Sequence, residues 1–248
     1  MKSLIALSMH KAGSTIADQI IVDFCIEKGY ELDRISKKVP VSPLPERDIF
    51  INYQPLIQAT GVYYGMARGP YVKEMPVIDR LKAIVHVRDP RDCLTSSYFS
   101  SKHSHVPPKN AEKLKIFQKK RDSAASMTID EYVKARSNNY LMRMSVLMEI
   151  IERHSAIKVV RYEDMVDATD NWLSEISSFI EQPLTESLRS RLGDKVNFRV
   201  NSEDISRHKR QVTPGDHRRK LRPDTIASVN ESLEPCLRYF GYEFNDPS

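Results

Sequence analysis

Residues able to bind an anion stand close together near the N-terminus of the chain. Lys11 is followed by Gly13 and by two hydroxyl residues, Ser14 and Thr15. A glycine permits a tight turn, and the first N–H groups of a helix form a nest at the positive end of the helix dipole. The segment therefore predicts a cradle for phosphate or sulfate, with the charge of Lys11 beside it. The alternative is an ordinary helix start capped by Ser14, with an exposed lysine before it.

This segment differs from the loop that binds nucleoside triphosphates, whose pattern is Gly-x-x-x-x-Gly-Lys-Ser/Thr. Lys11 precedes the glycine of the segment instead of following it, and the residue five positions before Gly13 is Ser8. The segment is therefore not a Walker A loop.

A second pair of anion-binding residue types flanks a predicted helix start. Arg88 follows an apolar run, and Ser96 stands eight residues later. Between them, Asp89 suits an N-cap, Pro90 the first helical position, and Asp92 the acidic first turn. The helix separates the pair by roughly 10 Å, much of which an arginine side chain spans by folding back. Both side chains are therefore expected to face one anion; the alternative is a surface arginine and an ordinary helical serine.

The segments that must position these residues alternate between short apolar runs and amphipathic stretches. The apolar runs predict buried strands over residues 3–8, 83–87 and 157–161. The amphipathic stretches predict helices over about 14–28, 128–154, 171–180 and 223–240, and Gly29 suits the end of the first. Such alternation is typical of βα units. We therefore expect one α/β domain over residues 1–248, with a central parallel sheet flanked by helices and a P-loop-like anion cradle after the first strand.

The composition is that of an ordinary globular protein. Hydrophobic residues make up 40% and charged residues 29% of the 248 residues, which excludes wholesale disorder. Only 8 residues are glycine, which argues against collagen-like and glycine-rich repeat proteins. The net charge of +5 favours an anionic ligand but is too small to demand a polyanion.

The cysteines and the N-terminus predict a cytoplasmic protein. Cys25, Cys93 and Cys236 lie far apart and form no Cys-x-x-Cys pair, so we expect neither a disulfide framework nor a zinc site. The apolar run at the N-terminus is broken by His10 and Lys11 before it reaches the length of a signal peptide. Nowhere does a stretch of about 18 apolar residues predict a transmembrane helix.

Four segments, spread over nearly the whole chain, resemble motifs of the cytosolic-type sulfotransferases, which use 3′-phosphoadenosine 5′-phosphosulfate (PAPS). They are Lys11–Thr15, Arg88–Asp92 with Ser96, Arg161–Met165, and Gly215–His217, the last with His217 in place of a tryptophan. The resemblance implies an enzyme that moves a sulfuryl group from PAPS to a hydroxyl or amine and releases 3′-phosphoadenosine 5′-phosphate (PAP). The implied acceptor is a small molecule, a carbohydrate or a lipid, and the implied reaction requires no metal.

The resemblance also implies a role for each matching residue. The 5′-phosphosulfate would be held by Lys11, Ala12, Gly13, Ser14 and Thr15. Lys11 would in addition offset the charge that develops on the bridging oxygen as the sulfuryl group leaves. The 3′-phosphate would be held by Arg88, Ser96 and Arg210. Tyr162 would contact the adenosine half.

Two family residues are missing, and one of them leaves the general base open. Ile16 stands where the family usually carries a tryptophan against the adenine, so stacking is weakened. The usual acceptor-activating histidine should fall near 65–68, where no histidine occurs. His10 is our first candidate for the base because it adjoins Lys11, although a structural histidine is an equal alternative. The other candidates are the carboxylates Glu46 and Asp48 and the loop histidines His103 and His105, which have no third ligand nearby and are not predicted to bind a metal.

A basic region near the C-terminus has two interpretations. Residues 207–210 and 218–222 are rich in Lys and Arg but contain no aromatic residue and match no duplex-binding motif, so nucleic acid is not the expected partner. We expect a lid over an anionic cofactor.

A nucleotide or small-molecule kinase is the rival enzyme class, and a nucleotide-binding module without turnover is the rival outside enzymes. The oligomeric state is left open.

Overall fold

The computed structural model describes residues 1–40, 42–104, 107, 110–198 and 213–244. Two compact units divide the chain. Unit 1 comprises Met1–Arg88 and Val146–Phe198, and unit 2 comprises Asp89–Ser145 and Arg199–Ser248. Arg210 and His105 lie outside the described residues.

Unit 1 contains a parallel sheet in the order β2-β3-β1-β4-β5. The strands are β1 (Leu4–Ser8), β2 (Glu31–Leu32), β3 (Val62–Arg68), β4 (Lys82–Val87) and β5 (Ile157–Arg161). All residues of β1 are buried, as expected for a central strand covered on both faces. The expected α/β fold with a parallel sheet is therefore confirmed, and so are the three predicted strands. Strands β2 and β3 were not predicted.

The register brings the carboxyl ends of the three central strands to one edge of the sheet. Ser8 at the end of β1 pairs with Arg68 of β3 on one side and with His86 of β4 on the other. The chain leaves β1 toward β2 and β3, and later adds β4 and β5 on the opposite side. The position between β1 and β4 is therefore a topological switch point, where open α/β sheets bind ligands.

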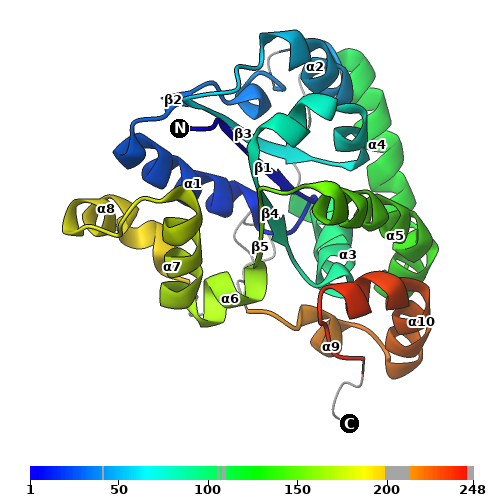
Figure 1. Ribbon diagram of the computed structural model, residues 1–248. Helices are drawn as coiled ribbons and strands as arrows, with labels where there is room; N and C mark the ends of the chain where they lie inside the picture. Colours follow the sequence, from blue (N-terminus) through cyan, green and yellow to red (C-terminus); the bar gives the residue numbers. More distant parts are fainter. Residues whose placement is uncertain (41, 105–106, 108–109, 199–212, 245–248) are drawn as a thin grey trace. The chain divides into compact units, whose positions relative to one another are not determined.

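The helices of unit 1 follow the expected boundaries closely where they were predicted. They are α1 (Ser14–Lys28), α2 (Glu46–Tyr53), α6 (Tyr162–Asp167), α7 (Thr169–Ile180) and α8 (Glu186–Leu192), with short helical turns η1 (Ile35–Lys37), η2 (Gln54–Leu56), η3 (Pro70–Glu74), η4 (Pro76–Arg80) and η6 (Gly193–Val196). Helix α1 packs against α7 and α8, and α7 packs against β5 (Figure 1). Phe24 of α1 and Trp172 of α7 are fully buried in this unit. Gly29 ends α1 in the left-handed conformation, as predicted.

Unit 2 is helical. Its elements are α3 (Pro90–Phe99), η5 (Ser100–Ser104), α4 (Ala111–Ala125), α9 (Asp216–Lys220) and α10 (Pro223–Tyr239), and α5 (Ile129–Arg153) begins in this unit and ends in unit 1. The predicted start of α3 is confirmed, because the Asp89 carboxylate accepts a hydrogen bond of 2.9 Å from the backbone N–H of Arg91.

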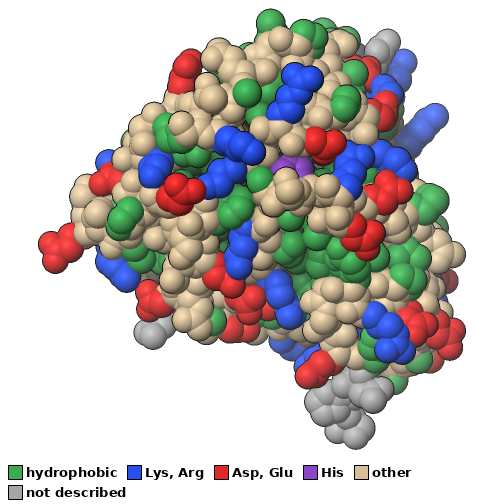
Figure 2. All heavy atoms as spheres, viewed as in Figure 1, with side chains coloured by type: hydrophobic (Ala, Val, Ile, Leu, Met, Phe, Trp, Pro, Cys, Tyr) green, Lys and Arg blue, Asp and Glu red, His purple; other side chains and the backbone are tan. Residues whose placement is uncertain are grey.

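Charged side chains of both signs lie next to one another on the surface of unit 1. Figure 2 shows blue and red side chains interspersed, and two of the pairs are Lys158–Glu175 at 3.0 Å and Lys82–Glu181 at 2.7 Å. Among the described residues, none of the helices combines the length and the apolar character that crossing a membrane requires.

Candidate functional site

The loop between β1 and α1 has the backbone of an anion cradle. Lys11 and Gly13 both adopt positive φ angles, 71° and 75°. Gly13 is the N-cap of α1, and its carbonyl accepts from the N–H of Ile16 at 3.1 Å. The N–H groups of Ser14 and Thr15 precede this bond, so they have no intrahelical acceptor. The alternative in which Ser14 caps the helix is wrong, because Ser14 is the first helical residue and caps nothing with its side chain.

His86 of β4 is hydrogen-bonded to this loop. Its Nε2 lies 2.8 Å from the carbonyl oxygen of Ala12. The imidazole is fully buried, and burial lowers its pKa to about 4. The ring is therefore neutral near pH 7, and Nε2–H donates to Ala12. The hydroxyl of Ser8 in turn donates to the His86 carbonyl at 2.7 Å, so the loop is tied to both strands that flank the switch point.

Arg88 and Tyr162 close the other side of the loop. Arg88 Nη1 donates to the carbonyl oxygen of Lys11 at 3.2 Å, and the guanidinium lies 4.2 Å from the centroid of the Tyr162 ring. The same ring packs against Gly13, where an added Cβ would lie 2.5 Å from Tyr162 Cδ2. Three of the predicted site elements, the loop, Arg88 and Tyr162, are thus brought together within unit 1.

Arg68 is a third cation of the site and was not predicted. It ends β3, and its Nε donates to the Ser14 hydroxyl at 2.7 Å. Lys11, Arg68 and Arg88 therefore follow or end three neighbouring strands at the same edge of the sheet. A strand assigned to the apolar run before Arg68 would have revealed it. Gly65, which adopts a positive φ of 79° within that strand, interrupts the apolar run by which a strand is recognised in the sequence.

The candidate carboxylates differ in their surroundings. Glu46 is half-buried at the start of α2, and its Oε1 accepts from the Tyr71 hydroxyl at 3.0 Å. Burial raises the pKa of the Glu46 carboxyl. Asp48 is also half-buried and pairs with Arg47 at 3.0 Å.

Other predicted residues lie elsewhere or outside the described residues. His10 is exposed at the start of the loop. Ser96 is half-buried in α3 of unit 2, so its sharing of an anion with Arg88 stays a prediction. His103 lies in η5. The contact of Arg210 with a 3′-phosphate falls outside the described residues.

Within unit 2, Asp92 of the second motif binds the fourth motif, Gly215–His217. The buried carboxylate of Asp92 accepts from the N–H groups of Gly215 at 2.8 Å and His217 at 2.9 Å. The ring Nδ1 of His217 lies 2.7 Å from the same carboxylate. His217, which stands where the resemblance implies a tryptophan, thus makes a buried polar contact.

Several cations of the basic region are paired within unit 2. Arg219 lies 3.3 Å from Asp216, and Arg222 lies 3.6 Å from Asp130. The run 207–210 lies outside the described residues, so the lid stays a prediction. Within the described part of the chain, no group of three or more His, Cys, Asp or Glu side chains is arranged to hold a metal ion.

Comparison with known proteins gives one family and several similar folds. The sequence profile of the family described as "Sulfotransferase domain" matches residues 72–234, more than half of the chain. Mouse sulfotransferase SULT7A1 complexed with PAP is 14% identical, with a TM-score of 0.64 over 97% of this chain and 88% of that one. Retinol dehydratase in a complex with retinol and PAP is 15% identical, with a TM-score of 0.57 over 99% and 83%. Sulfotransferase STF9 from Mycobacterium avium is 9% identical, with a TM-score of 0.53 over 98% and 77%. These likenesses show the fold. None of the curated proteins compared by sequence matches the chain significantly.

Proposed function

Because the chain belongs to the sulfotransferase domain family, we propose that it is an enzyme that transfers a sulfuryl group from PAPS to a hydroxyl or amine. The observation that carries this proposal is the convergence of Lys11, Arg68 and Arg88 on the loop at the switch point of the sheet. A group of cations beside a helix N-terminus suits the phosphosulfate end of the donor. Two of the similar folds contain PAP, the product that this reaction would release.

The loop would hold the 5′-phosphosulfate through its backbone N–H groups, the Ser14 and Thr15 hydroxyls and Lys11. Tyr162 would contact the adenosine half, and Arg88, Ser96 and Arg210 would hold the 3′-phosphate. A guanidinium has five N–H donors, so the bond from Arg88 to the Lys11 carbonyl is compatible with a phosphate contact. His86 does not reach the donor in this proposal; it keeps the loop in place.

The chemistry needs positioning and charge stabilisation more than covalent catalysis. The acceptor oxygen or nitrogen attacks sulfur, and the bond between sulfur and the bridging oxygen breaks. Lys11 offsets the negative charge that develops on that oxygen. A base takes the acceptor proton, and exposed His10 at the mouth of the loop is the base that the sequence predicts.

We further propose that the two units form one sulfotransferase domain over residues 1–248. The family match supports this, because residues 72–234 include parts of both units. The cytoplasmic location stays a prediction that rests on the three widely spaced cysteines, all of which are buried. The acceptor is proposed to be a small molecule, a carbohydrate or a lipid.

Calorimetry with nucleotides tests the donor. PAP should bind at least about tenfold more tightly than AMP, because charge-assisted hydrogen bonds to the 3′-phosphate add on the order of 1.5 kcal/mol or more. Equal affinity for PAP and AMP contradicts the proposal. Binding of ATP that requires magnesium supports the rival kinase, and PAP binding without sulfuryl transfer to any acceptor class supports a non-catalytic module. PAPS with labelled sulfate, offered with phenols, sterols, retinoids, sugars and amines, then identifies the acceptor class.

A further inference from the structure

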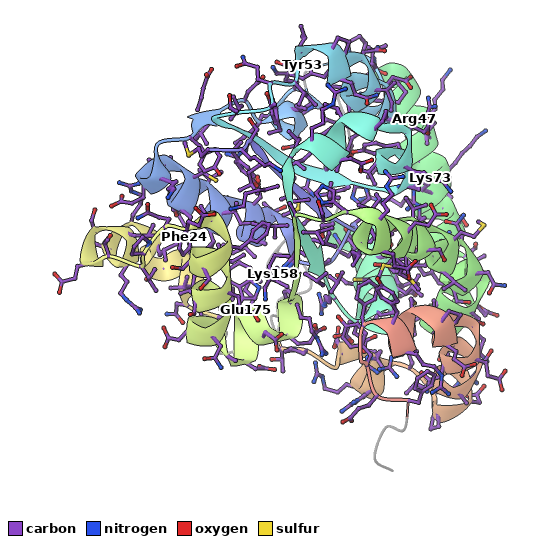
Figure 3. All side chains as sticks on the ribbon, in the orientation of Figure 1. Phe24, Arg47, Tyr53, Lys73, Lys158 and Glu175 are labelled. Atoms are coloured by element: carbon purple, nitrogen blue, oxygen red, sulfur yellow. The ribbon has the colours of Figure 1, made fainter. Side chains whose placement is uncertain are left out.

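One carboxylate of unit 1 differs from its neighbours on the same helix. Glu46 and Asp48 at the start of α2 are both half-buried, whereas Arg47 between them is exposed. Helix α2 packs against η3, and Figure 3 labels Arg47 on the helix and Lys73 on η3. Arg47 pairs with Asp48 and with Glu74, so these three charges satisfy one another. Glu46 has a different set of contacts.

Hydrogen bonds connect Glu46 to the anion cradle. The Tyr71 hydroxyl donates to Glu46 Oε1 at 3.0 Å and accepts from the backbone N–H of Arg68 at 3.2 Å. The side chain of Arg68 donates through Nε to the Ser14 hydroxyl at 2.7 Å. Two residues, Tyr71 and Arg68, therefore connect the Glu46 carboxylate to the Ser14 hydroxyl of the cradle. All four residues belong to unit 1.

The surroundings of Glu46 suit a group that must take up a proton. Burial raises the pKa of its carboxyl, while the Tyr71 hydrogen bond and the charge of Arg68 lower it by less. The other charged groups near α2 are engaged elsewhere: Lys38, which follows η1, bonds to Asp33 and Tyr53. Glu46 is thus contacted by the Tyr71 hydroxyl and by Arg68, which acts through its charge and through a backbone hydrogen bond.

We propose that Glu46 is the general base that takes the proton of the acceptor, with Tyr71 and Arg68 as its positioning residues; this inference rests on the proposed sulfuryl transfer. The acceptor lone pair forms the new bond to sulfur as its O–H or N–H bond breaks, and the proton passes to a Glu46 carboxylate oxygen. The bond between sulfur and the bridging oxygen breaks, and its electron pair stays on the phosphate of PAP. Glu46 then returns its proton to water.

The geometry favours Glu46 over the other candidates in unit 1. Asp48 is paired with the adjacent Arg47 at 3.0 Å, whereas Glu46 is bonded to Tyr71, whose hydroxyl also accepts from the N–H of Arg68. His10 is exposed at the start of the loop. A base with a raised pKa in a partly desolvated position accepts a proton more effectively than an ordinary surface carboxylate.

Glu46→Gln is the main test, and Asp48→Asn on the same helix is the matched control. Single-turnover transfer of labelled sulfate from PAPS is measured with 4-nitrophenol, retinol and androsterone as probe acceptors. If none of these reacts, transfer to water is measured instead. Glu46→Gln should slow transfer by roughly 10²- to 10⁴-fold and remove the ascending limb of the pH profile. Asp48→Asn should change the rate by no more than about twofold. The proposal is overturned if His10→Ala loses the ascending limb of the pH profile while Glu46→Gln stays active and keeps that limb.

Tyr71→Phe distinguishes a base from a merely structural carboxylate. Loss of the hydroxyl donor removes a contact that favours the ionised form, so the ascending limb should move to higher pH while the plateau rate falls only modestly. A lower plateau with an unmoved limb contradicts the assignment.

Two measurements separate failure of this inference from failure of the proposed function. PAP binding by calorimetry reports the donor site alone, and Glu46→Gln should bind PAP as tightly as the unmodified chain or more tightly, since a nearby negative charge is removed. Carboxyl ¹³C NMR, assigned by the resonance missing from Glu46→Gln, needs no acceptor and should show a pKa for Glu46 above the ordinary value of about 4.3. A pKa at or below that value overturns the inference even when PAP binds.

Discussion

His86 and Ala12 are joined by a contact of 2.8 Å between the imidazole Nε2 and the backbone carbonyl oxygen, which ties β4 to the anion-binding loop. Two backbone carbonyls of the loop, those of Lys11 and Ala12, and one hydroxyl, that of Ser14, are bonded by side chains from other elements. The donors are His86 from β4, Arg88 after β4, and Arg68 from β3. The His86 contact is the one of these that lies fully inside the protein.

Acid stability should depend on His86. Burial lowers its pKa from 6.5 to about 4, so between these values the unfolded chain binds the extra proton and stability rises with pH. The contribution is roughly 3 kcal/mol, fully present above pH 6.5 and lost as the pH falls to 4. His86→Gln keeps an N–H for Ala12 without titrating, so its urea-unfolding free energy should lack this rise. Parallel curves for the two proteins from pH 4 to 6.5 contradict the assignment, and His86→Leu, which also loses the donor, should be less stable than His86→Gln throughout.

Gly13 should tolerate no side chain. Gly13→Ala places a Cβ 2.5 Å from Tyr162 Cδ2 and forces alanine to a φ of 75°. Gly29→Ala is the matched control, because Gly29 has a similar φ of 85° and nothing within 4 Å of the added Cβ. The control should lose about 1 kcal/mol of unfolding free energy for the backbone strain alone. Gly13→Ala should lose roughly 2 kcal/mol more, measured by urea unfolding. Equal losses would show that the Tyr162 ring moves aside without cost.

Lys11 and Arg88 should have separable roles. Lys11→Ala should lower turnover more than PAP affinity, because its charge is needed most as the bridging oxygen becomes negative. Arg88→Ala should mainly weaken PAP binding. Lys73→Ala is the control, since Lys73 pairs on the surface with Glu149 and should change neither quantity by more than about twofold. The opposite pattern, measured by calorimetry and single-turnover kinetics, would place the reactive end of the donor elsewhere.

Asp92 should stabilise unit 2. Asp92→Ala leaves the N–H groups of Gly215 and His217 and the His217 ring without their shared acceptor. The expected loss is about 3 kcal/mol of unfolding free energy, because several buried donors are left unsatisfied. Glu234→Ala, which removes an exposed pair with Arg238 on α10, should cost at most about 0.5 kcal/mol. A loss for Asp92→Ala as small as that of the control would mean that water replaces the carboxylate.

Much of the fold follows from hydrophobic pattern. Strands β1, β4 and β5 were predictable because each is a short apolar run, and β1 and β4 have nearly every residue buried. The start of α3 was predictable because Asp89 and Pro90 act through local geometry. Strand β2 has only two residues, both exposed, so it carries no apolar signal.

The site was predictable only in part. The resemblance selected Lys11, Arg88 and Tyr162, and the structure brings these together. Arg68 and His86 depend on strand register, which is a long-range property that one sequence without its sheet order does not give. The cap was predicted on Ser14 in the alternative interpretation, but the Arg68 side chain engages that hydroxyl and Gly13 takes the cap position.

The backbone of Lys11 has a consequence for engineering this loop. Lysine at a φ of 71° carries left-handed strain of roughly 1–2 kcal/mol, which glycine would relieve. Lys11 therefore occupies a position where glycine would make the fold more stable than lysine does. A Lys11→Gly variant should keep the loop conformation and the Arg88 contact to the residue 11 carbonyl while losing the charge. Stability and the proposed role of Lys11 in sulfuryl transfer thus favour different residues at this position, and selection for thermal resistance alone would replace the lysine.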